Sequence, residues 1–365
     1  MMNPMTATIW LRAETKAREA RCAIAPAHAK SLVEHGFRVV VEKSGQRAIP
    51  DESFREAGCE LVEPGSWVDA PEDVFVLGVK DLPESSEPLH HQHIYFGHAY
   101  KSQDGWRSLL RRFKAGGGKL YDVEYLTDES GRRVAAFGYW AGFTGCAVGV
   151  KTWIGQQLGR DPVVAPIHPY PGQTELVGEL DRELRDAARL SGRKPTVIIV
   201  GAGGRVGAGA GDLAEQLGLV ITRWDIAETA RGGPFEEILE HDLFVNCVLV
   251  NTKIPPFVTM ETLSAPGRRL SVISDVSCDP GEYNPVPVYS KPTTFGEPTV
   301  RVIPHPVLDL TAIDHLPSML PVEASEDFGR QLLPHLLHLE PGPGGVWRRA
   351  LDVFDEKTGN LELND

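Results

Sequence analysis

Hydrophobic residues in the first third of the chain occur in short runs, separated by polar or amphipathic stretches. The runs at 8–11 and 38–41 predict β-strands. Between them, Pro26 opens an amphipathic helix that Gly36 ends, because proline suits a first helical turn and glycine follows a last one. Three further runs predict strands at 74–80, 93–100 and 119–126. Strands alternating with helices favour βαβ units and a mostly parallel sheet.

The pattern changes in the middle of the chain. Residues 139–158 mix small and apolar side chains with few charges, which predicts one long helix leaving the first domain. A proline-rich stretch and an amphipathic helix over about 175–190 follow. A second series of predicted strands lies at 195–200, 219–225, 244–250 and 270–277. From about residue 325 the chain again has a helical pattern.

A glycine-rich segment, GAGGRVG at 201–207, lies between a predicted strand and a predicted helix. Glycines there permit a tight turn and close approach of the backbone to a pyrophosphate. Asp225 ends the next predicted strand, at the sequence separation from the glycines where an acidic residue binds the ribose of NAD. A carboxylate at that position disfavours the extra phosphate of NADP. Arg223 and Arg231 lie close to Asp225 in sequence, so NADP is not excluded as the cofactor. The alternative interpretation is a glycine-rich turn that binds no ligand.

These elements predict an α/β fold of two domains, each a mostly parallel sheet flanked by helices. We expect the NAD-binding domain at 138–324. We expect a discontinuous substrate and catalytic domain at 1–137 plus about 325–365, with the helical tail returning to it.

Composition narrows the function classes. The 365 residues carry a net charge of −13, which repels nucleic acid and anionic lipid. No apolar run approaches the roughly 18–20 residues of a membrane helix, and the first residues do not resemble a signal peptide. The five cysteines include no CxxC pair, so we expect a reducing, cytoplasmic setting and no metal site.

Two titratable residues follow predicted strands in the first domain. Lys80 ends one run and His98 lies near the end of the next, and ligands of open α/β sheets bind beyond the carboxyl ends of strands. Both could move protons in one crevice. The alternatives are a surface lysine and a packed histidine. Arg21, Arg132 and Arg133 lie in or beside turns, where guanidinium groups suit carboxylates, although solvated surface charge is the commoner role.

The chain resembles the NAD-dependent, lysine-forming saccharopine dehydrogenases, within the wider group of alanine dehydrogenase and nicotinamide nucleotide transhydrogenase. The resemblance covers nearly the whole chain and implies two Rossmann-like domains with an inter-domain cleft. It is carried by LRAETK at 11–16, EAR at 19–21, GVKDLPE at 78–84, FGHAYKSQDGW at 96–106, GRRVAAFGYWAGFTG at 131–145, RKPTVIIVGAGGRVG at 193–207, RWDIAETARGGPF at 223–235, ISDVSCDP at 273–280 and AIDHLPSMLP at 312–321.

The resemblance implies oxidative deamination of saccharopine to L-lysine and 2-oxoglutarate, with NAD as cofactor. It implies Lys80 as the base that accepts the amine proton, and His98 as the acid–base group that assists water attack. Implied substrate contacts are Arg21, Lys80, Arg133, Phe137, Ser277, Cys278, Asp279 and Pro280, and implied tuning residues are Lys16, Asp81 and Glu124. Implied cofactor contacts are Gln103, Arg132, Gly201, Gly203, Gly204, Arg205, Asp225, Thr229, Leu249, Val276, Ile313, Asp314, His315 and Leu316.

Two positions depart from the family pattern. Asp81 stands where the family often has glutamate, so the tuning of Lys80 could differ. Val206 stands where some members have cysteine, which excludes a disulfide between that position and Cys247. Neither departure changes the proposed acid–base pair.

Two rival functions stay open at this point. One is a related opine- or alanine-type amino-acid dehydrogenase, and the other is a catalytically inactive NAD-binding sensor. The retained Lys80, His98 and arginines argue against the sensor. We expect small-molecule substrates, no nucleic-acid or membrane partner, and a monomer.

Overall fold

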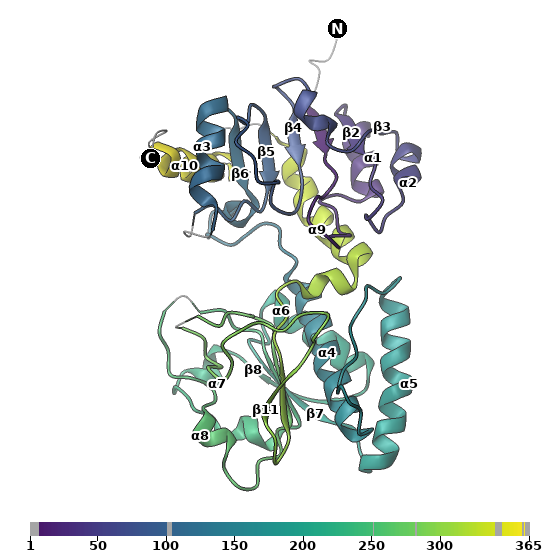
Figure 1. Ribbon diagram of the computed structural model, residues 1–365, viewed down its shortest axis with the longest axis vertical. Helices are drawn as coiled ribbons and strands as arrows, with labels where there is room; N and C mark the ends of the chain where they lie inside the picture. The colour runs from purple at the N-terminus through teal and green to yellow at the C-terminus, as the bar shows by residue number, and fades with distance from the viewer. Residues whose placement is uncertain are drawn as a thin grey trace. The chain divides into compact units, whose positions relative to one another are not determined.

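The chain folds as two units, and each contains its own six-stranded sheet. This computed structural model describes residues 7–100, 104–250, 252–281, 283–339, 345–359 and 361. One unit comprises Met1–Ala136 with Pro321–Asp365, and the other comprises Phe137–Leu320. Figure 1 shows that the yellow-green C-terminal helices pack with the purple and blue N-terminal elements. None of the helices in these ranges combines the length and apolar character needed to span a membrane.

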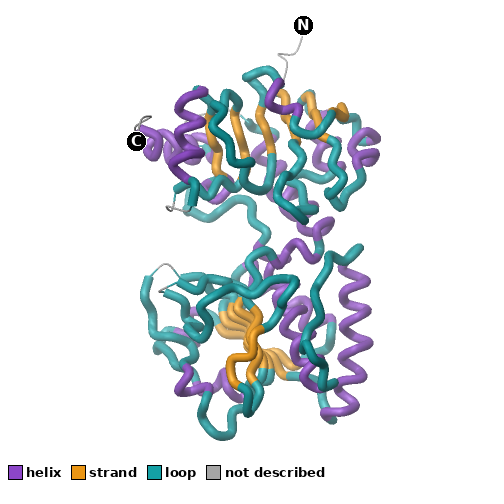
Figure 2. Tube along the Cα trace, in the orientation of Figure 1, coloured by secondary structure: helices purple, strands orange, loops and turns teal. Residues whose placement is uncertain are grey.

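The sheet of the first unit is entirely parallel, in the order β3-β2-β1-β4-β5-β6. The strand order reverses between β1 and β4, and ligands of open α/β sheets bind beyond the carboxyl ends at such a reversal. Figure 2 shows these strands side by side in orange, with purple helices around them. The strands are β1 Thr8–Leu11, β2 Arg38–Glu42, β3 Glu60–Val62, β4 Phe75–Leu77, β5 Gln92–Tyr95 and β6 Lys119–Asp122.

Helices from both ends of the chain cover this sheet. The side chain of Trp347 packs edge-on against Tyr121 of β6, with ring centroids 5.7 Å apart. Ser325 accepts a hydrogen bond of 2.9 Å from the backbone N–H of Cys22, so the tail is tied to the N-terminal segment. The helices are α1 Pro26–Glu34, α2 Asp51–Glu56, α3 Trp106–Gly116, α9 Pro321–Leu336 and α10 Val346–Gly359, with the 3₁₀ helices η1 Ser66–Asp69 and η2 Val123–Tyr125.

The second unit has a mixed sheet in the order β11-β12-β10-β9-β7-β8, in which only the edge strand β11 is antiparallel. Its strands are β7 Thr196–Val200, β8 Val220–Trp224, β9 Leu243–Asn246, β10 Val272–Asp275, β11 Val300–Ile303 and β12 Leu308–Thr311. Its helices are α4 Gly138–Gln157, α5 Gln173–Ser191, α6 Arg205–Gln216, α7 Ile226–Thr229 and α8 Met260–Leu263, with η3 Glu236–Glu240 and η4 Leu316–Met319.

Glycines let α4 and α6 pack backbone to backbone. A Cβ at Gly142 would collide with the carbonyl group of Val206, and a Cβ at Gly209 would collide with the carbonyl group of Tyr139. Helix α4 is buried along most of its length, which explains its small and apolar composition. The close contact fixes α6, and therefore the turn that precedes it.

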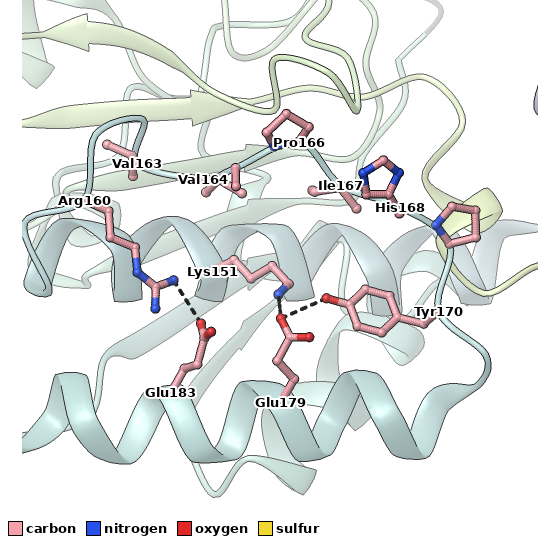
Figure 3. A pocket seen from close by; sticks show the side chains of 12 residues that line it. Lys151, Arg160, Val163, Val164, Pro166, Ile167, His168, Tyr170, Glu179 and Glu183 are labelled. Atoms are coloured by element: carbon pink, nitrogen blue, oxygen red, sulfur yellow. Dashed lines mark hydrogen bonds and ion pairs between the residues drawn. The ribbon is translucent and has the colours of Figure 1, made fainter.

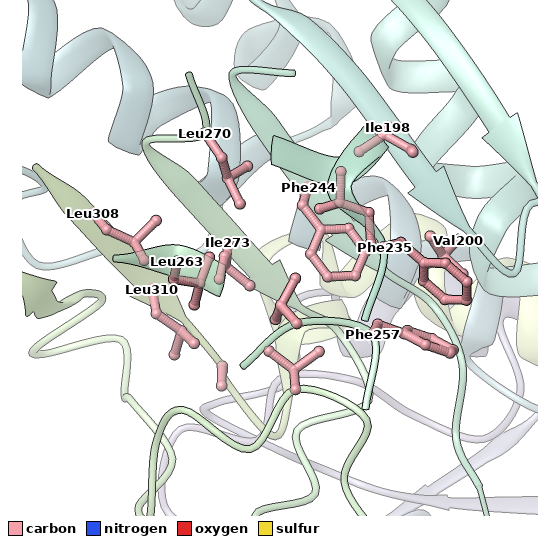
Figure 4. Close-up of a cluster of buried hydrophobic side chains, with 14 residues drawn as sticks. Ile198, Val200, Phe235, Phe244, Phe257, Leu263, Leu270, Ile273, Leu308 and Leu310 are labelled. Carbon is pink, nitrogen blue, oxygen red and sulfur yellow. The ribbon is translucent and has the colours of Figure 1, made fainter. Parts of the chain in front are cut away.

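The core on one face of the second sheet is aliphatic and aromatic. Figure 4 shows Phe244 of β9 beside Phe235, and Leu263 between Ile273 of β10 and Leu310 of β12; all are buried. These positions come from alternate residues of the strands and from the loops that cross them. Their burial follows from the continuous apolar runs that predict a sheet covered by other structure.

The predicted fold class is confirmed, since two mostly parallel sheets flanked by helices are present. The predicted helix 139–158 is α4, at Gly138–Gln157. The predicted strand ends were wrong in three runs of the first unit, where β4 ends at Leu77, β5 at Tyr95 and β6 at Asp122. They were also wrong in two runs of the second unit, where β9 ends at Asn246 and β10 at Asp275. The pattern gave no prediction for β3, α3, β11 or β12. The inter-domain cleft, and the substrate and cofactor roles of the two units, stay predictions.

One carboxylate ties together the amino ends of three strands in the second unit. Asp242 receives two hydrogen bonds of 2.6 Å from Arg193, one of 2.8 Å from the Thr196 amide and two from Arg269. Burial acts to raise the pKa of Asp242, but these donors outweigh burial and lower the pKa to about 2. The ionised carboxylate therefore stabilises the folded state.

Acid should remove this stabilisation. The folded pKa lies below the unfolded value of 3.8, so the contribution is complete above the unfolded pKa and is lost as the pH falls toward 2. Between about pH 5 and pH 2, we expect the difference in unfolding free energy between wild type and Asp242→Asn to shrink by about 1–2 kcal/mol. Urea unfolding at a series of pH values measures it. For Asp186→Asn, an exposed carboxylate on α5, the difference should stay constant; an equal change there would contradict the assignment.

Candidate functional site

Lys80 and His98 lie on two neighbouring loops, those that follow β4 and β5. The two strands are parallel neighbours, with Leu77 paired to Ile94. Each of the two residues lies three positions beyond the end of its strand, in a loop and not within the strand as the sequence pattern suggested. The Phe96 amide donates a hydrogen bond of 3.3 Å to the Val79 carbonyl, which joins the loops. The structure therefore brings the predicted acid–base residues to one edge of one sheet.

A buried ion pair holds the Lys80 backbone from both sides. The Glu14 carboxylate accepts hydrogen bonds from the amides of Val79, at 2.7 Å, and Lys80, at 2.9 Å. The Arg12 guanidinium donates to the Lys80 carbonyl and lies 3.3 Å from Glu14. A Cβ at Gly78 would collide with the Arg12 guanidinium, so a larger residue there would displace that side chain. Burial raises the pKa of Glu14, and the Arg12 charge and the two amides oppose that shift.

His98 lies in an unusual backbone conformation. Its φ angle is +47°, in the left-handed region that costs a non-glycine residue roughly 1 kcal/mol or more. The imidazole is half-buried and stacks on the Phe96 ring, with centroids 6.3 Å apart and planes inclined by 20°. Strained conformations at loop positions often accompany functional roles.

Arg21 is buried, not a solvated surface arginine. It is 3% exposed and forms two hydrogen bonds with Glu19, at 2.8 Å and 2.7 Å. Burial acts to raise the pKa of Glu19, but the hydrogen bonds and charge of Arg21 lower it below its usual value, and the Lys80 charge adds to that effect. Arg21, Glu19 and Lys80 thus belong to one electrostatic cluster.

The other predicted residues of the first unit lie in its loops. Asp81 is exposed and Glu124 is half-buried, and the negative charges of both act on Asp122 at the end of β6. Arg132 and Arg133 are exposed in a turn that an isolated bridge between Thr127 and Arg133 closes. Lys16 is exposed. Gln103 lies outside the described residues.

The glycine-rich turn of the second unit is built against Asp225. The Asp225 carboxylate accepts hydrogen bonds from the Gly203 amide, at 2.6 Å, and the Ile226 amide, at 2.8 Å. Gly201 has a φ angle of +86°, and a Cβ at Gly207 would collide with the Gly201 carbonyl. Amides of the first turn of α6 have no acceptor within the helix and suit an anion. This cradle fits the pyrophosphate of a dinucleotide.

The remaining predicted residues of the second unit lie mostly beyond the carboxyl ends of its strands. Thr229 donates from its hydroxyl to the Asp225 carbonyl at 2.9 Å, and Leu249 is 55% exposed after β9. Arg205 begins α6, and Gly204 is its N-cap. Phe137 is half-buried and begins the second unit. Along the segment after β12, Ile313 and Leu316 are buried, Asp314 is exposed and His315 packs on Phe295.

A buried carboxyl that sequence reasoning missed shapes the loop after β10. Asp275 accepts hydrogen bonds from the Ser277 hydroxyl, at 2.6 Å, the Asn246 amide and the Tyr289 hydroxyl. Burial raises the pKa of Asp275, against the effect of these donors. The loop contains Val276, the first residue after the strand, and the predicted substrate contacts Ser277–Pro280. Cys278 in this loop has a φ angle of +49°.

A cavity of about 360 Å³ in the second unit contains none of the predicted site residues. It lies between α4, α5 and the proline-rich segment, and its charges are paired internally. Figure 3 shows Lys151 and the Tyr170 hydroxyl both directed at Glu179, and Arg160 directed at Glu183. The contacts attach the proline-rich segment and α5 to α4. The cavity is therefore interpreted as structural.

Known proteins resemble this chain in sequence and in fold. Residues 10–144 match the family model of the alanine dehydrogenase/PNT N-terminal domain. A saccharopine dehydrogenase [NAD(+), L-lysine-forming] of Yarrowia lipolytica is 50% identical over 95% of this chain and 96% of its own length. The corresponding protein of Emericella nidulans is 48% identical over 97% and 98%. A solved L-alanine dehydrogenase shares the fold, with a TM-score of 0.65, 19% identity, and coverage of 95% of this chain and 92% of its own.

Filling the cradle should weaken dinucleotide binding. In Gly207→Ala the new Cβ would lie 2.5 Å from the Ala202 Cα and 2.8 Å from its carbonyl carbon, so the turn must open. We expect the dissociation constant of NADH, measured by fluorescence titration, to rise about tenfold or more. Gly178→Ala is the matched control, because its Cβ meets open space on α5. Equal affinity in both variants would contradict the assignment of this turn.

Proposed function

The chain belongs to the saccharopine dehydrogenases of the NAD(+), L-lysine-forming type, and on that basis we propose how its residues divide the chemistry. The reaction is the oxidative deamination of saccharopine to L-lysine and 2-oxoglutarate, and it is reversible. The observation that carries the residue assignment is the adjacency of the loops bearing Lys80 and His98, joined between Phe96 and Val79. Two proton-transfer groups at one sheet edge suit a reaction with two separate proton movements.

Lys80 is the base of the first step. Oxidation of the CH–NH group requires the secondary amine to lose a proton as hydride leaves the neighbouring carbon. The Lys80 Nζ accepts that proton. The backbone of Lys80 is fixed by Glu14 and Arg12, so its side chain starts from a defined position. Such fixed placement is a large part of what a general base contributes.

His98 serves the hydrolytic steps. It removes a proton from water as the oxygen attacks the imine carbon of the substrate, and returns a proton to the departing amine nitrogen. A histidine changes protonation near neutral pH and can perform both transfers. The Phe96 ring fixes the plane of the imidazole from one side.

Arginines of the first unit recognise the carboxylates of the substrate. Saccharopine carries three carboxylates, and the chain has a net charge of −13, so local positive charge is needed. Arg21 keeps its orientation through its two bonds to Glu19, and Arg133 is exposed near the turn at Thr127. The substrate is also contacted by Phe137 and by the loop Ser277–Pro280. The proton affinity of the acid–base groups is tuned by Lys16, Asp81 and Glu124.

The cofactor is NAD and not NADP. When bound, it supplies the hydride acceptor. The turn at 201–207 and Asp225 would hold its pyrophosphate and ribose, with Thr229, Leu249, Val276 and the segment 313–316 around the rest. Arg223 and Arg231, which could have served a 2′-phosphate, are instead paired with Glu215 and Glu237 at 2.5 Å. That pairing supports NAD.

Substrate assays separate this function from its rivals. NADH oxidation with 2-oxoglutarate plus L-lysine tests the saccharopine reaction, and ornithine or ammonia in place of lysine tests an opine- or alanine-type dehydrogenase. Binding of NADH without turnover would favour the inactive sensor.

We further propose a cytoplasmic monomer. Sedimentation velocity tests the monomeric state, and cell fractionation tests the location.

Removing either acid–base group should slow the reaction. Lys80→Met and His98→Gln should each lower kcat about 10²-fold or more, the usual effect of losing a general acid or base. Steady-state assays in both directions measure this. Lys30→Met and His35→Gln replace exposed residues of the same types around α1 and should retain wild-type rates. Wild-type rates in Lys80→Met or His98→Gln would end the assignment.

Shortening the carboxylate of Asp225 should relax cofactor choice. Asp225→Ser removes the charge that repels a 2′-phosphate and the oxygens that suit a ribose diol. We expect the ratio of kcat/KM for NADH to that for NADPH to fall about tenfold or more. Asp186→Ser on α5 is the control. An unchanged ratio in Asp225→Ser would mean that another group selects the cofactor.

A further inference from the structure

A buried carboxyl group lies under the turn that carries His98. Asp122 is the last residue of β6 and is 0% exposed. Its register partner on the parallel neighbour β5 is Tyr95, and the chain then continues through Gly97 to His98. Sequence reasoning assigned no role to Asp122, because a strand residue in an apolar run gives no signal that its side chain meets a catalytic loop.

Gly97 packs directly on this carboxyl group. A Cβ at position 97 would lie 3.3 Å from the Asp122 Oδ2 and 2.7 Å from the Leu120 Cδ2. Glycine is therefore the residue that lets the turn rest on β6. A shift of the Asp122 carboxyl group would be transmitted to Gly97, and His98 is the next residue along the chain.

The hydrogen bonding of Asp122 is incomplete. Its Oδ1 accepts a bond of 3.0 Å from the Glu124 amide, whereas its Oδ2 faces Gly97, whose amide favours the ionised carboxyl group, and has no other partner among the described residues. The hydroxyls of Tyr95 and Tyr100 are also buried and lack partners within the described ranges. A buried polar atom without a partner is costly, so its retention points to a role outside folding.

The surroundings of Asp122 favour a carboxyl group that titrates. Burial raises its pKa to about 7; the Glu124 and Gly97 amides oppose the shift, and the charges of Glu124 and Asp81 increase it. Two tyrosines lie near Asp122, namely Tyr95 at the end of β5 and Tyr100 in the loop that follows it. The other titratable or charged groups that act on these tyrosines are Tyr125 from η2, Asp355 from α10, Arg112 from α3 and Arg12 from the segment after β1.

We propose that Asp122 is a positioning residue for His98, whose ionised carboxyl group holds the Gly97–His98 turn in place. The proposal rests on the acid–base role of His98 given above. The Gly97 amide favours the ionised carboxyl group, so protonation of Asp122 weakens its hold on the backbone that presents the imidazole. No new chemical step is added.

The test substitutes the charge and keeps the shape. Asp122→Asn retains an oxygen for the Glu124 amide and removes the ionisable group. We expect kcat to fall about tenfold with KM for saccharopine nearly unchanged. The pH profile of kcat should contain an inflection near pH 7 from Asp122 in the wild type and should lack it in Asp122→Asn. Asp309→Asn, which replaces a buried carboxylate in β12 of the other unit, should keep the wild-type pH profile.

Two outcomes would overturn the proposal. One is a wild-type kcat in Asp122→Asn. The other is a lower kcat with an unchanged pH profile, since that result marks a purely structural role. Wild-type turnover of His98→Gln would instead refute the proposed function, and the pH profile of Asp122→Asn would still show whether Asp122 controls turnover.

Discussion

The backbone of one residue, Lys80, is held by a buried ion pair at both its N–H and its carbonyl group. Glu14 binds the amide side and Arg12 binds the carbonyl side, and the two also bind each other. Both come from the segment directly after the central strand β1. A buried charge is stable only with such partners. The edge of the sheet is consequently rigid at the position where the side chain must meet its substrate.

The second unit obtains comparable rigidity without a buried ion pair. Helices α4 and α6 touch through backbone atoms at Gly142 and Gly209, which sets the start of α6 and the glycine-rich turn before it. Asp225 then closes that turn from the next strand. Close packing and a single carboxylate thus perform what an ion pair performs in the first unit, and both devices position a loop beyond the carboxyl end of a strand.

The fold could be predicted where local pattern and tertiary packing agree, as in α4 or in the strand before Gly201. The ends of β4 and β5 could not be predicted, since contacts from Arg12, Glu14 and Asp122 turn the backbone away from a still apolar pattern. Burial of Arg21 escaped prediction for the same reason. A charged residue is buried only when a partner is placed beside it, and that placement is tertiary information.

The return of α9 and α10 to the first unit affects how the chain is synthesised. Phe137–Leu320 is complete on the ribosome before Pro321–Asp365 has been translated, whereas the N-terminal sheet must wait for its last two helices. Until then the ring of Tyr121 lacks its contact with Trp347, and the amide of Cys22 lacks its contact with Ser325. The nascent N-terminal half therefore exposes apolar surface longest, which makes it the part with most need of chaperone protection.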